Sequence, residues 1–478
     1  MRNYNTFLLT LLVAIFSLGL YWIPDDIGFA GFKLRKMDIL ADIRQQNVEG
    51  QPPTDEGPVI FEDSTAQSIP VDTLPVLPER HDTFTTTPLL PVNIVPAVDS
   101  VYFGQMIEDY TPRQQGLTSF FRAIDSIDTH RRTVRVAFYG DSFVEGDILL
   151  GDLRDTLQSL WGGAGVGFVP VTSEVARFKR SFKHEYKGWT PHSIVKRDDN
   201  KYPYGINGFV YVPAPDAKII YEGLDYFRHT RQWGTIRFFY SARQPVPVRW
   251  QQGTGLMEET TLPSGEIQQW KWGTGVPDMR RFTMQFPVVH PGFVVYGASL
   301  ETGPGIYLDN FSLRGNSGGP LMRLQPGVVQ QFDHWQHYDL IVVQVGLNAV
   351  TNDLSNIRWY EAELERTFKH LRLCFPAQPI LIVSVSDRAD KTDAETTTMR
   401  GVPAIAQLQR RLARRHGFLF FDLYHAMGGP GTMVRFAHQR PRLANLDYTH
   451  LTHDGGRVIG HLFAKILLKE QKKIYPQN

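Results

Sequence analysis

Short apolar segments alternate with longer amphipathic segments over residues 106–175 and 304–478. The apolar segments are rich in Val, Ile, Leu and Phe and fall at 133–140, 305–315, 339–346, 379–386 and 418–424. A stretch with apolar residues at helical spacing follows each of them, and another, 116–127, precedes the first. Strands that are apolar at successive positions are buried on both faces. The pattern therefore predicts an α/β domain with a five-stranded parallel, doubly wound sheet.

The segment 176–303 interrupts this alternation between the first and second strands. It is dense in Tyr, Trp, Phe, Val, Gly and Pro and alternates with a period of two in runs such as "IRFFYSARQPVPVRW". Such alternation is typical of half-buried strands, so we expect an inserted all-β domain, a sandwich. Four of its tryptophans are expected mainly in the core, with a sugar-binding platform as the alternative: Trp233, Trp250, Trp270 and Trp272.

The N-terminal region has the pattern of an anchor followed by a tether. An apolar run of seventeen residues, 7–23, follows Arg2. Seventeen residues is close to the minimum length of a membrane-spanning helix. We predict an uncleaved transmembrane anchor at 1–24, with a cleaved signal peptide as the alternative. Residues 25–105 include a Pro- and Thr-rich stretch typical of an extended tether. We therefore expect a protein of the cell envelope, held by its N-terminal segment at the periplasmic face.

Composition and charge narrow the classes of function. The chain has 478 residues, enough for two or three domains, and its 50 basic and 49 acidic residues give a net charge of +1. This balance argues against a nucleic-acid partner, since phosphate binding needs a basic surplus. Cys374 is the single cysteine, which excludes an internal disulfide and a cysteine-based zinc site.

Two serines are candidate nucleophiles. Ser317 lies in "RGNSGGPL", which matches the nucleophile loop of trypsin-like proteases, but strand–helix alternation follows it where such a protease has β-barrels. Ser142 lies in "RVAFYGDSF", directly after the first predicted strand, at the edge where parallel sheets bind ligands. Gly140 permits a tight turn there, and N–H groups at the following helix start can hold an oxyanion. We therefore favour Ser142, with a helix cap as its alternative role.

Three further residues near predicted strand ends fit acyl-transfer chemistry. Asn348 follows the third strand, where its amide can donate to an oxyanion or simply cap the loop. Asp447 and His450 lie three positions apart in "LDYTHLTHDGG", where one loop can supply a base and its orienting carboxylate. His453 is the competing base. Two other histidines are expected in loops or at the surface, His425 and His438.

These segments together resemble the SGNH (GDSL-type) hydrolase superfamily, over about 106–175 and 304–478. The matching blocks occur in family order: Gly-Asp-Ser at 140–142, "DNFSLRG" at 309–315, Gly-Leu-Asn at 346–348 and "DYTHLT" at 447–452. The resemblance implies a flavodoxin-like sheet and a triad of nucleophile Ser142, base His450 and orienting Asp447. It also implies an oxyanion hole made of the backbone N–H groups of Ser142 and Gly315 and the side chain of Asn348.

The same resemblance gives Ser317 a different role and shows two departures from the family pattern. Ser317 and the glycines after it would shape the floor of the pocket. Phe143 stands where the family name has Leu, and Ala349 replaces an Asp that often follows the block-three Asn. The second change bears on the geometry of that loop more than on catalysis.

The order of the blocks and the β insert are similar to one SGNH subgroup, the envelope O-acetylesterases and O-acetyltransferases of peptidoglycan and other glycans. In that subgroup a carbohydrate-binding-module-like domain interrupts the catalytic domain after the first block. This implies an O-acetylated glycan substrate, no cofactor or metal, and a membrane-bound O-acyltransferase as a possible partner. The alternatives are a catalytically weak glycan-binding scaffold of an acylation complex, a protease using Ser317, and a lipase or thioesterase.

Overall fold

The computed structural model describes residues 28–29, 32–33, 106–196, 202–391 and 395–475. It divides into a unit at Met1–Val76, of which only the paired strands β1 (Gly28–Phe29) and β2 (Phe32–Lys33) are described, and a unit at Leu77–Asn478. The predicted anchor at 1–24 and nearly all of the tether at 25–105 lie outside the described residues. Among the helices that the structure describes, none combines the length and hydropathy needed to cross a bilayer.

The α/β part of the larger unit is built on a six-stranded sheet in the order β14-β4-β15-β16-β19-β3. The five predicted parallel strands are confirmed; they are β4 (Thr133–Gly140), β14 (Gly305–Ser312), β15 (Leu340–Gln344), β16 (Ile380–Val383) and β19 (Leu419–Phe421). Nearly all their residues are buried, which explains the continuous apolar runs. A short antiparallel strand, β3 (Glu108–Asp109), closes one edge; its two acidic residues carry no apolar signal.

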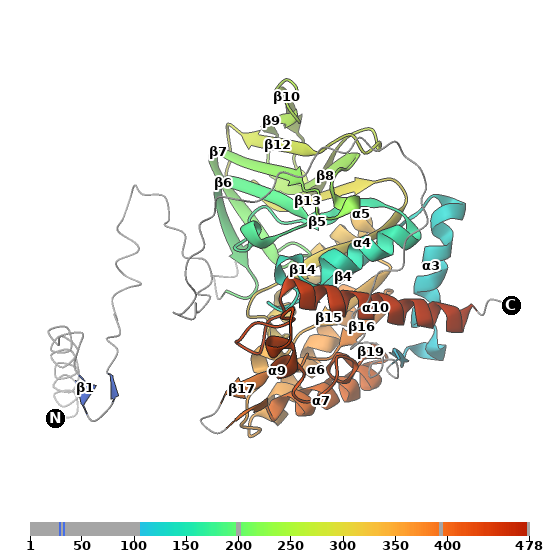
Figure 1. Ribbon diagram of the computed structural model, residues 1–478. Helices are drawn as coiled ribbons and strands as arrows, with labels where there is room; N and C mark the ends of the chain where they lie inside the picture. The colour runs from blue at the N-terminus through green and yellow to red at the C-terminus, as the bar shows by residue number, and fades with distance from the viewer. Residues whose placement is uncertain (1–27, 30–31, 34–105, 197–201, 392–394, 476–478) are drawn as a thin grey trace, which may run out of the picture. The chain divides into compact units, whose positions relative to one another are not determined.

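Helices cover both faces of this sheet (Figure 1). One group packs around the C-terminal helix: α3 (Gly116–His130), α4 (Leu150–Trp161) and α10 (His453–Ile474). The other group is α5 (Pro326–Gln336), α6 (Ile357–Cys374) and α7 (Gly401–His416). The shorter elements are η2 (Pro112–Gln114), η3 (Glu145–Asp147), η6 (Gly319–Arg323), η7 (Leu347–Ala349), α8 (Leu423–Ala426), α9 (Thr432–His438), and a hairpin of β17 (Ala389–Lys391) and β18 (Thr396–Thr398).

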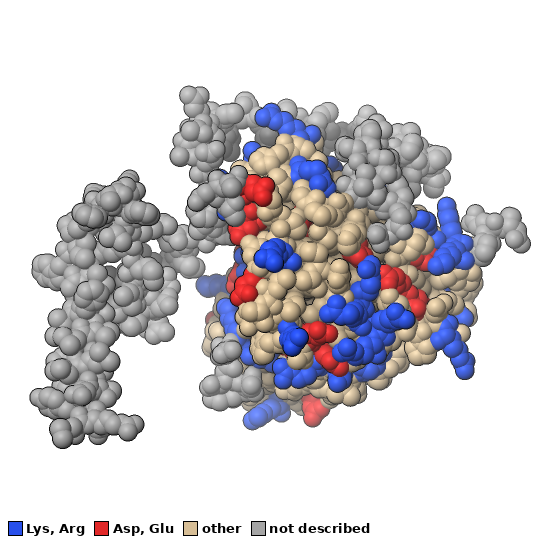
Figure 2. Space-filling view, turned by 90° about the horizontal axis from the view of Figure 1, so that it is seen from below, with Lys and Arg blue, Asp and Glu red and all other residues tan. Residues whose placement is uncertain are grey.

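Basic side chains gather on the face seen from below, where α6 and α7 lie (Figure 2). Many of them have acidic partners on the neighbouring helix. Arg411 of α7 lies 3.6 Å from Glu361 of α6, and Arg415 lies 2.9 Å from Glu365. The cluster is therefore in large part a surface ion-pair network that joins two helices, where each pair contributes little individually.

The β-rich region is a nine-stranded antiparallel sheet. Its strands are β5 (Ala164–Val169), β6 (Phe182–Ser193), β7 (Phe209–Gly223), β8 (Thr235–Ala242), β9 (Val246–Gln252), β10 (Glu258–Leu262), β11 (Gly265–Trp272), β12 (Arg281–Phe286) and β13 (Val294–Thr302), with η4 (Ala176–Phe178) and η5 (Arg228–Thr230) between them. Strand β5 lies ahead of the predicted boundary at 176 yet pairs with β13. Strand β7 pairs with β6, β12 and β13, so hydrogen bonds link all nine strands in one network.

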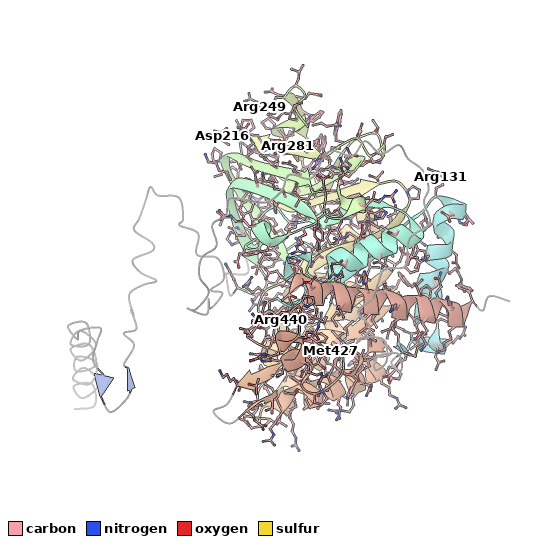
Figure 3. All side chains as sticks on the ribbon, in the orientation of Figure 1. Arg131, Asp216, Arg249, Arg281, Met427 and Arg440 are labelled. Carbon is pink, nitrogen blue, oxygen red and sulfur yellow. The ribbon has the colours of Figure 1, made fainter. Side chains whose placement is uncertain are left out.

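The tryptophans of this region divide between its core and its margin. Trp233 and Trp250 are buried, as predicted for core residues, whereas Trp270 and Trp272 are half-buried and pack against Trp250. Cross-strand ion pairs on neighbouring strands support the register. Figure 3 labels one of the cations, Arg249, which lies opposite Glu259 and 2.5 Å from its carboxylate.

A buried ion network joins the β-rich region to the α/β sheet. Arg135 of β4 is fully buried and contacts Glu301 of β13 at 2.7 Å and Asp309 of β14 at 3.2 Å. Arg237 of β8 approaches Glu301 at 3.2 Å, and the Tyr338 hydroxyl donates to Asp309 at 2.7 Å. Since buried charges are tolerated only when paired, this network holds both parts in one arrangement.

Candidate active site

The structure brings Ser142, His450 and Asp447 together at the carboxyl ends of the parallel strands. The Ser142 Oγ lies 2.9 Å from His450 Nε2, and His450 Nδ1 lies 2.7 Å from an Asp447 carboxylate oxygen. A carboxylate only accepts hydrogen bonds, so Nδ1 carries the proton and Nε2 is left to accept from the serine. This is the geometry of a nucleophile, a base and an orienting acid.

The loop that carries Asp447 and His450 is shaped by its own hydrogen bonds. The second Asp447 oxygen accepts the backbone N–H groups of Thr449 at 2.9 Å and His450 at 3.0 Å. Tyr448 between them adopts a left-handed φ of 52°. Partial burial acts to raise the pKa of Asp447, but the hydrogen bonds from His450 and Thr449 outweigh it and lower that pKa. The carboxylate therefore stays ionised and holds the imidazole in one tautomer.

Ser142 lies in a turn, not at a helix start. Strand β4 ends at Gly140, and α4 begins only at Leu150, after the 3-10 turn η3. The expectation that a helix N-terminus presents its N–H groups beside the serine is therefore wrong, because Gly146 and Asp147 adopt positive φ values of 72° and 61° and delay the helix.

Buried Asp147 explains why this turn keeps its shape. Its carboxylate accepts from Arg154 at 2.9 and 3.2 Å, from Ser181 at 2.5 Å and from Asn310 at 2.8 Å. Burial alone raises the pKa of Asp147, but Arg154 outweighs it and lowers that pKa. The Asn310 amide also donates to the Val144 carbonyl at 3.1 Å, so the first and second blocks are tied together.

Three candidate oxyanion donors lie in the loops that follow β4, β14 and β15. The backbone N–H groups of Ser142 and Gly315 have no protein acceptor within the described parts of the chain. Gly315 has a φ of 79°, a left-handed conformation that favours glycine. Asn348 is exposed in η7, and its amide donates to Asp141 at 3.1 Å and to the Asn316 carbonyl at a long 3.4 Å.

Asp141 is a further candidate residue of the site, to which the sequence alone assigned no role. Its side chain is 2% exposed, and besides Asn348 it accepts the backbone N–H of Phe143 at 2.9 Å. Burial raises the pKa of Asp141 to about 6, against the opposing effect of the Phe143 hydrogen bond. The sequence signal for Asp141 was its position inside the Gly-Asp-Ser block. Residue spacing alone could not show that its carboxylate would contact Asn348, which follows another strand of the sheet.

The competing residues have other contacts. The Ser317 carbonyl accepts from the Tyr360 hydroxyl at 2.7 Å, and no histidine among the described residues hydrogen-bonds the Ser317 side chain. His453 is the first residue of α10, where burial lowers its pKa. The two histidines that were expected in loops or at the surface also have other partners. His425 lies 2.8 Å from Asp422, and His438 lies 3.2 Å from the Tyr448 hydroxyl.

Comparison with known proteins concerns the family and the fold of this part of the chain. Residues 278–458 match the model of the GDSL-like Lipase/Acylhydrolase family. The matched segment is therefore similar to the GDSL-like acylhydrolases, the type that the four sequence blocks resemble. The matched range contains Gly315, Asn348, Asp447 and His450 but not Ser142, because the β-rich region separates the first block of the SGNH domain from the others.

One solved structure shares the fold of most of the larger unit. A peptidoglycan O-acetylesterase is similar with a TM-score of 0.62 and 18% identity, over 77% of this chain and 99% of that one. A salicylyl-acyltransferase from a tetracycline biosynthetic pathway (TM-score 0.27, 11% identity, 63% and 97% covered) is more distant. So is an acetylxylan esterase from Geobacillus stearothermophilus (TM-score 0.23, 13% identity, 34% and 73% covered). No curated protein matches the chain.

Proposed function

We propose that the protein is a serine esterase that removes or transfers O-acetyl groups on a cell-envelope carbohydrate, through an acyl-serine intermediate. The observation that carries the proposal is the continuous hydrogen-bonded path from Ser142 through His450 to Asp447. A serine aligned with a base and an ionised carboxylate is poised for nucleophilic attack on an ester carbonyl. The domain family supports acylhydrolase chemistry, and the fold of the peptidoglycan O-acetylesterase supports a glycan ester as the substrate.

The first half of the reaction forms the acyl-enzyme. The Ser142 oxygen attacks the acetyl carbonyl carbon while His450 Nε2 takes its proton, and Asp447 stabilises the resulting imidazolium. The tetrahedral oxyanion accepts from the N–H groups of Ser142 and Gly315 and from the Asn348 amide, whose long contact to Asn316 it replaces. Collapse breaks the bond to the sugar oxygen, which leaves with the proton from His450.

The second half regenerates the serine. His450 takes a proton from water, or from the hydroxyl of an acceptor sugar, as that oxygen attacks the acetyl carbon, and then returns the proton to Ser142. Water gives acetate and an esterase; a sugar gives an acetylated glycan and a transferase. The steps need no metal ion or cofactor.

The predicted anchor and tether support a location in the cell envelope, at the periplasmic face. There the SGNH domain would meet O-acetylated glycans, and a membrane-bound O-acyltransferase would be its partner in glycan acylation. Of the four tryptophans predicted as core or sugar platform, the half-buried Trp270 and Trp272 are the two able to contact a sugar, because Trp233 and Trp250 are buried.

Active-site labelling tests the proposal. The full-length protein, solubilised in detergent, is treated with a fluorophosphonate probe, and the modified residue is mapped by mass spectrometry. We expect the label on Ser142, its loss in His450→Ala, and its retention in the matched control Ser317→Ala. Replacing Ser142 by Ala should lower the rate of p-nitrophenyl acetate hydrolysis by roughly 10⁴–10⁶.

Each of the other outcomes of the labelling experiment would support a different function. Label on Ser317 would support a protease, and absence of any label would support a glycan-binding scaffold. If the label is found on Ser142, unlabelled protein is then incubated with acetylated glycans, with and without acceptor sugars. Free acetate identifies an esterase, and an acetylated acceptor identifies a transferase.

A further inference from the structure

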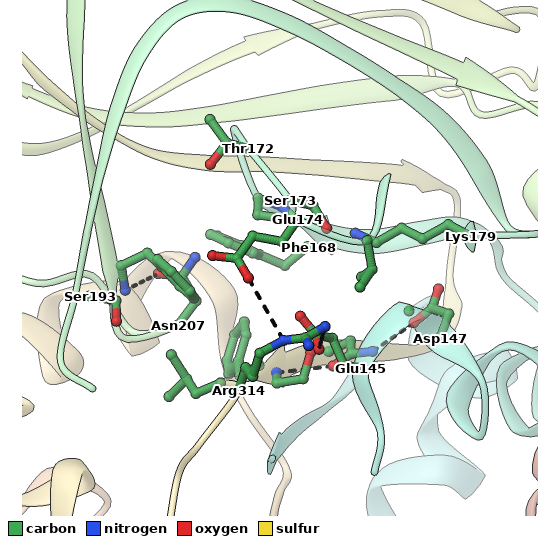
Figure 4. Close-up of a pocket in the computed structure, with 18 of the residues that line it drawn as sticks. Glu145, Asp147, Phe168, Thr172, Ser173, Glu174, Lys179, Ser193, Asn207 and Arg314 are labelled. Atoms are coloured by element: carbon green, nitrogen blue, oxygen red, sulfur yellow. Dashed lines mark hydrogen bonds and ion pairs between the residues drawn. The ribbon is translucent and has the colours of Figure 1, made fainter. Parts of the chain in front are cut away.

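A cavity of about 190 Å³ lies between the SGNH domain and the β-rich region (Figure 4). Part of its wall comes from the loops that carry the active site: Glu145 lies three positions after Ser142, and Arg314 directly precedes Gly315. The Arg314 guanidinium lies 2.8 Å from Glu145, which ties these two loops together at the cavity. Val195, another residue of the lining, lies 3.6 Å from where a Gly315 Cβ would stand, so the cavity adjoins the predicted oxyanion site.

The cavity has the polarity of a sugar site. Hydroxyl and amide groups face it from the β-rich region, together with aromatic rings: Thr172, Ser173, Ser193, Asn207, Phe182 and Phe209. Drug-sized ligand pockets have volumes of about 300–1,000 Å³, so this smaller cavity suits one sugar unit with its substituent.

The charges of the lining leave two lysines, Lys179 and Lys196, without an ion pair within the described parts of the chain. Four cationic and three acidic side chains line the cavity: Arg154, Lys179, Lys196 and Arg314, and Glu145, Asp147 and Glu174. Two of the arginines have acidic partners, Arg154 on Asp147 at 2.9 Å and Arg314 on Glu145 and Glu174 at 2.8 and 3.7 Å. Of the two lysines, Lys196 is exposed and Lys179 is half-buried.

Lys179 reaches into the cavity (Figure 4) with its ammonium 4.9 Å from the centroid of the Phe182 ring. Burial lowers the pKa of Lys179 to about 8, so it is still mostly charged at pH 7. Among the acidic groups, Asp147 has the largest opposing effect on the pKa of Lys179. Its carboxylate, however, already accepts four hydrogen bonds from Arg154, Ser181 and Asn310. The ammonium therefore keeps donors to offer to a ligand.

We propose that this cavity binds a sugar unit that carries a carboxylate, with Lys179 as the counter-ion of that carboxylate. The inference rests on the proposed function and specifies its substrate as an acidic glycan. One negative charge balances the single net positive charge of the lining. A doubly charged phosphate would exceed this single positive charge, which favours a singly charged carboxylate.

Two sources supply such a carboxylate: the ring carboxyl of a hexuronic acid, or a carboxyalkyl ether on an amino sugar. Binding is measured by titration calorimetry with the full-length Ser142→Ala protein, so that no turnover occurs. The ligands are an oligosaccharide of each kind and the carboxyl-reduced form of each. We expect one acid to bind at least about tenfold tighter than its reduced form, and the tighter acid identifies the source.

Variants at two lysines of the same region separate the proposed contact from general electrostatics. Lys179→Met keeps the apolar stem against Phe182 and should remove the preference for the acid, while Lys179→Arg should retain it. Lys183→Met is the matched control, because Lys183 is 53% exposed and pairs with Glu185 at 2.7 Å. If Lys179→Met does not fold, as judged by its thermal unfolding, Lys179→Gln takes its place.

Two results would overturn the inference: equal binding of the acids and their reduced forms, or an acid preference that survives Lys179→Met. Neither result depends on catalysis. Failure of the labelling experiment at Ser142 would instead overturn the proposed function, and the calorimetric comparison would still show whether the cavity binds a carboxylate.

Discussion

Replacing Asp141 by Asn should separate the activity of this protein from its stability. In the variant, one side-chain oxygen still accepts from the Phe143 N–H, but an NH₂ group now faces the Asn348 amide. Two donors cannot share that contact, so Asn348 turns away or presents its oxygen to the oxyanion. We expect kcat to fall by about 10²–10³, the usual effect of losing one oxyanion donor.

Stability should change in the opposite direction, and only at neutral to alkaline pH. The pKa of Asp141 in the folded state is about 6, against 3.8 for the free group, because the carboxyl is buried. Above pH 6 the folded protein must hold a disfavoured charge, at a cost of about 3 kcal/mol for a shift of about two pKa units. That cost fades as the pH falls through 6 towards 3.8. Allowing about 1–2 kcal/mol for altered hydrogen bonds, Asp141→Asn should stabilise by about 1–2 kcal/mol at pH 8.

Two measurements check this reasoning. Urea unfolding of the wild type and Asp141→Asn at pH 8 and pH 4.5 should show the stabilisation at pH 8 only. Steady-state hydrolysis of p-nitrophenyl acetate by Asp141→Asn, Asn348→Ala and the double variant should show losses that do not multiply, because both changes remove the same donor. The reasoning is refuted if Asp141→Asn keeps kcat within threefold of the wild type, or if the double variant loses the product of the single effects.

Two further predictions concern the framework of the site. Arg135→Met should lower the free energy of unfolding by about 3–5 kcal/mol in urea titrations, because it leaves Asp309 buried without its cation and Glu301 with Arg237 alone; an effect below 1 kcal/mol would contradict this role. Gly315→Ala should cost about 1–2 kcal/mol for the left-handed φ of 79°, since its Cβ would meet only Val195 at an ordinary 3.6 Å. Because Ala keeps the backbone N–H, kcat should fall only as far as the strained backbone moves that donor, by no more than about 10²–10³, and a larger fall in kcat would contradict a role limited to one oxyanion donor.

Much of the α/β domain could be predicted because its strands are buried on both faces. Burial forces apolar residues at successive positions, so β4 was found to the residue and the other four strands within a few positions. Strand β3 carries only Glu108 and Asp109 and left no such trace. Strand β5 follows directly on α4 and was assigned to the α/β part, since nothing in its composition shows that its partner is β13.

The turn after Ser142 shows a second limit. A polar segment followed by a helical pattern looks like a helix start, but whether the helix begins at once depends on backbone conformation. Here Gly146 and Asp147 take positive φ values, and Asp147 is stabilised there by Arg154. A non-glycine residue rarely adopts this conformation, so only the contacts that hold it could have predicted it.

The two candidate serines show why position along a fold carries more weight than a local string. Ser317 has the flanking residues of a protease nucleophile, yet its carbonyl serves to accept from Tyr360, and its neighbours pack between α6 and the sheet. Ser142 meets His450 across 308 positions of sequence, because β4 and the loop before α10 end at the same edge of the sheet. The topology could be inferred from apolar periodicity, and it alone brings a serine, a histidine and an aspartate to one point. The contacts of Asp141 and Lys179 could not be inferred from topology, because they depend on which buried carboxylates already have partners. That is a property of the packed side chains, which a single sequence does not display.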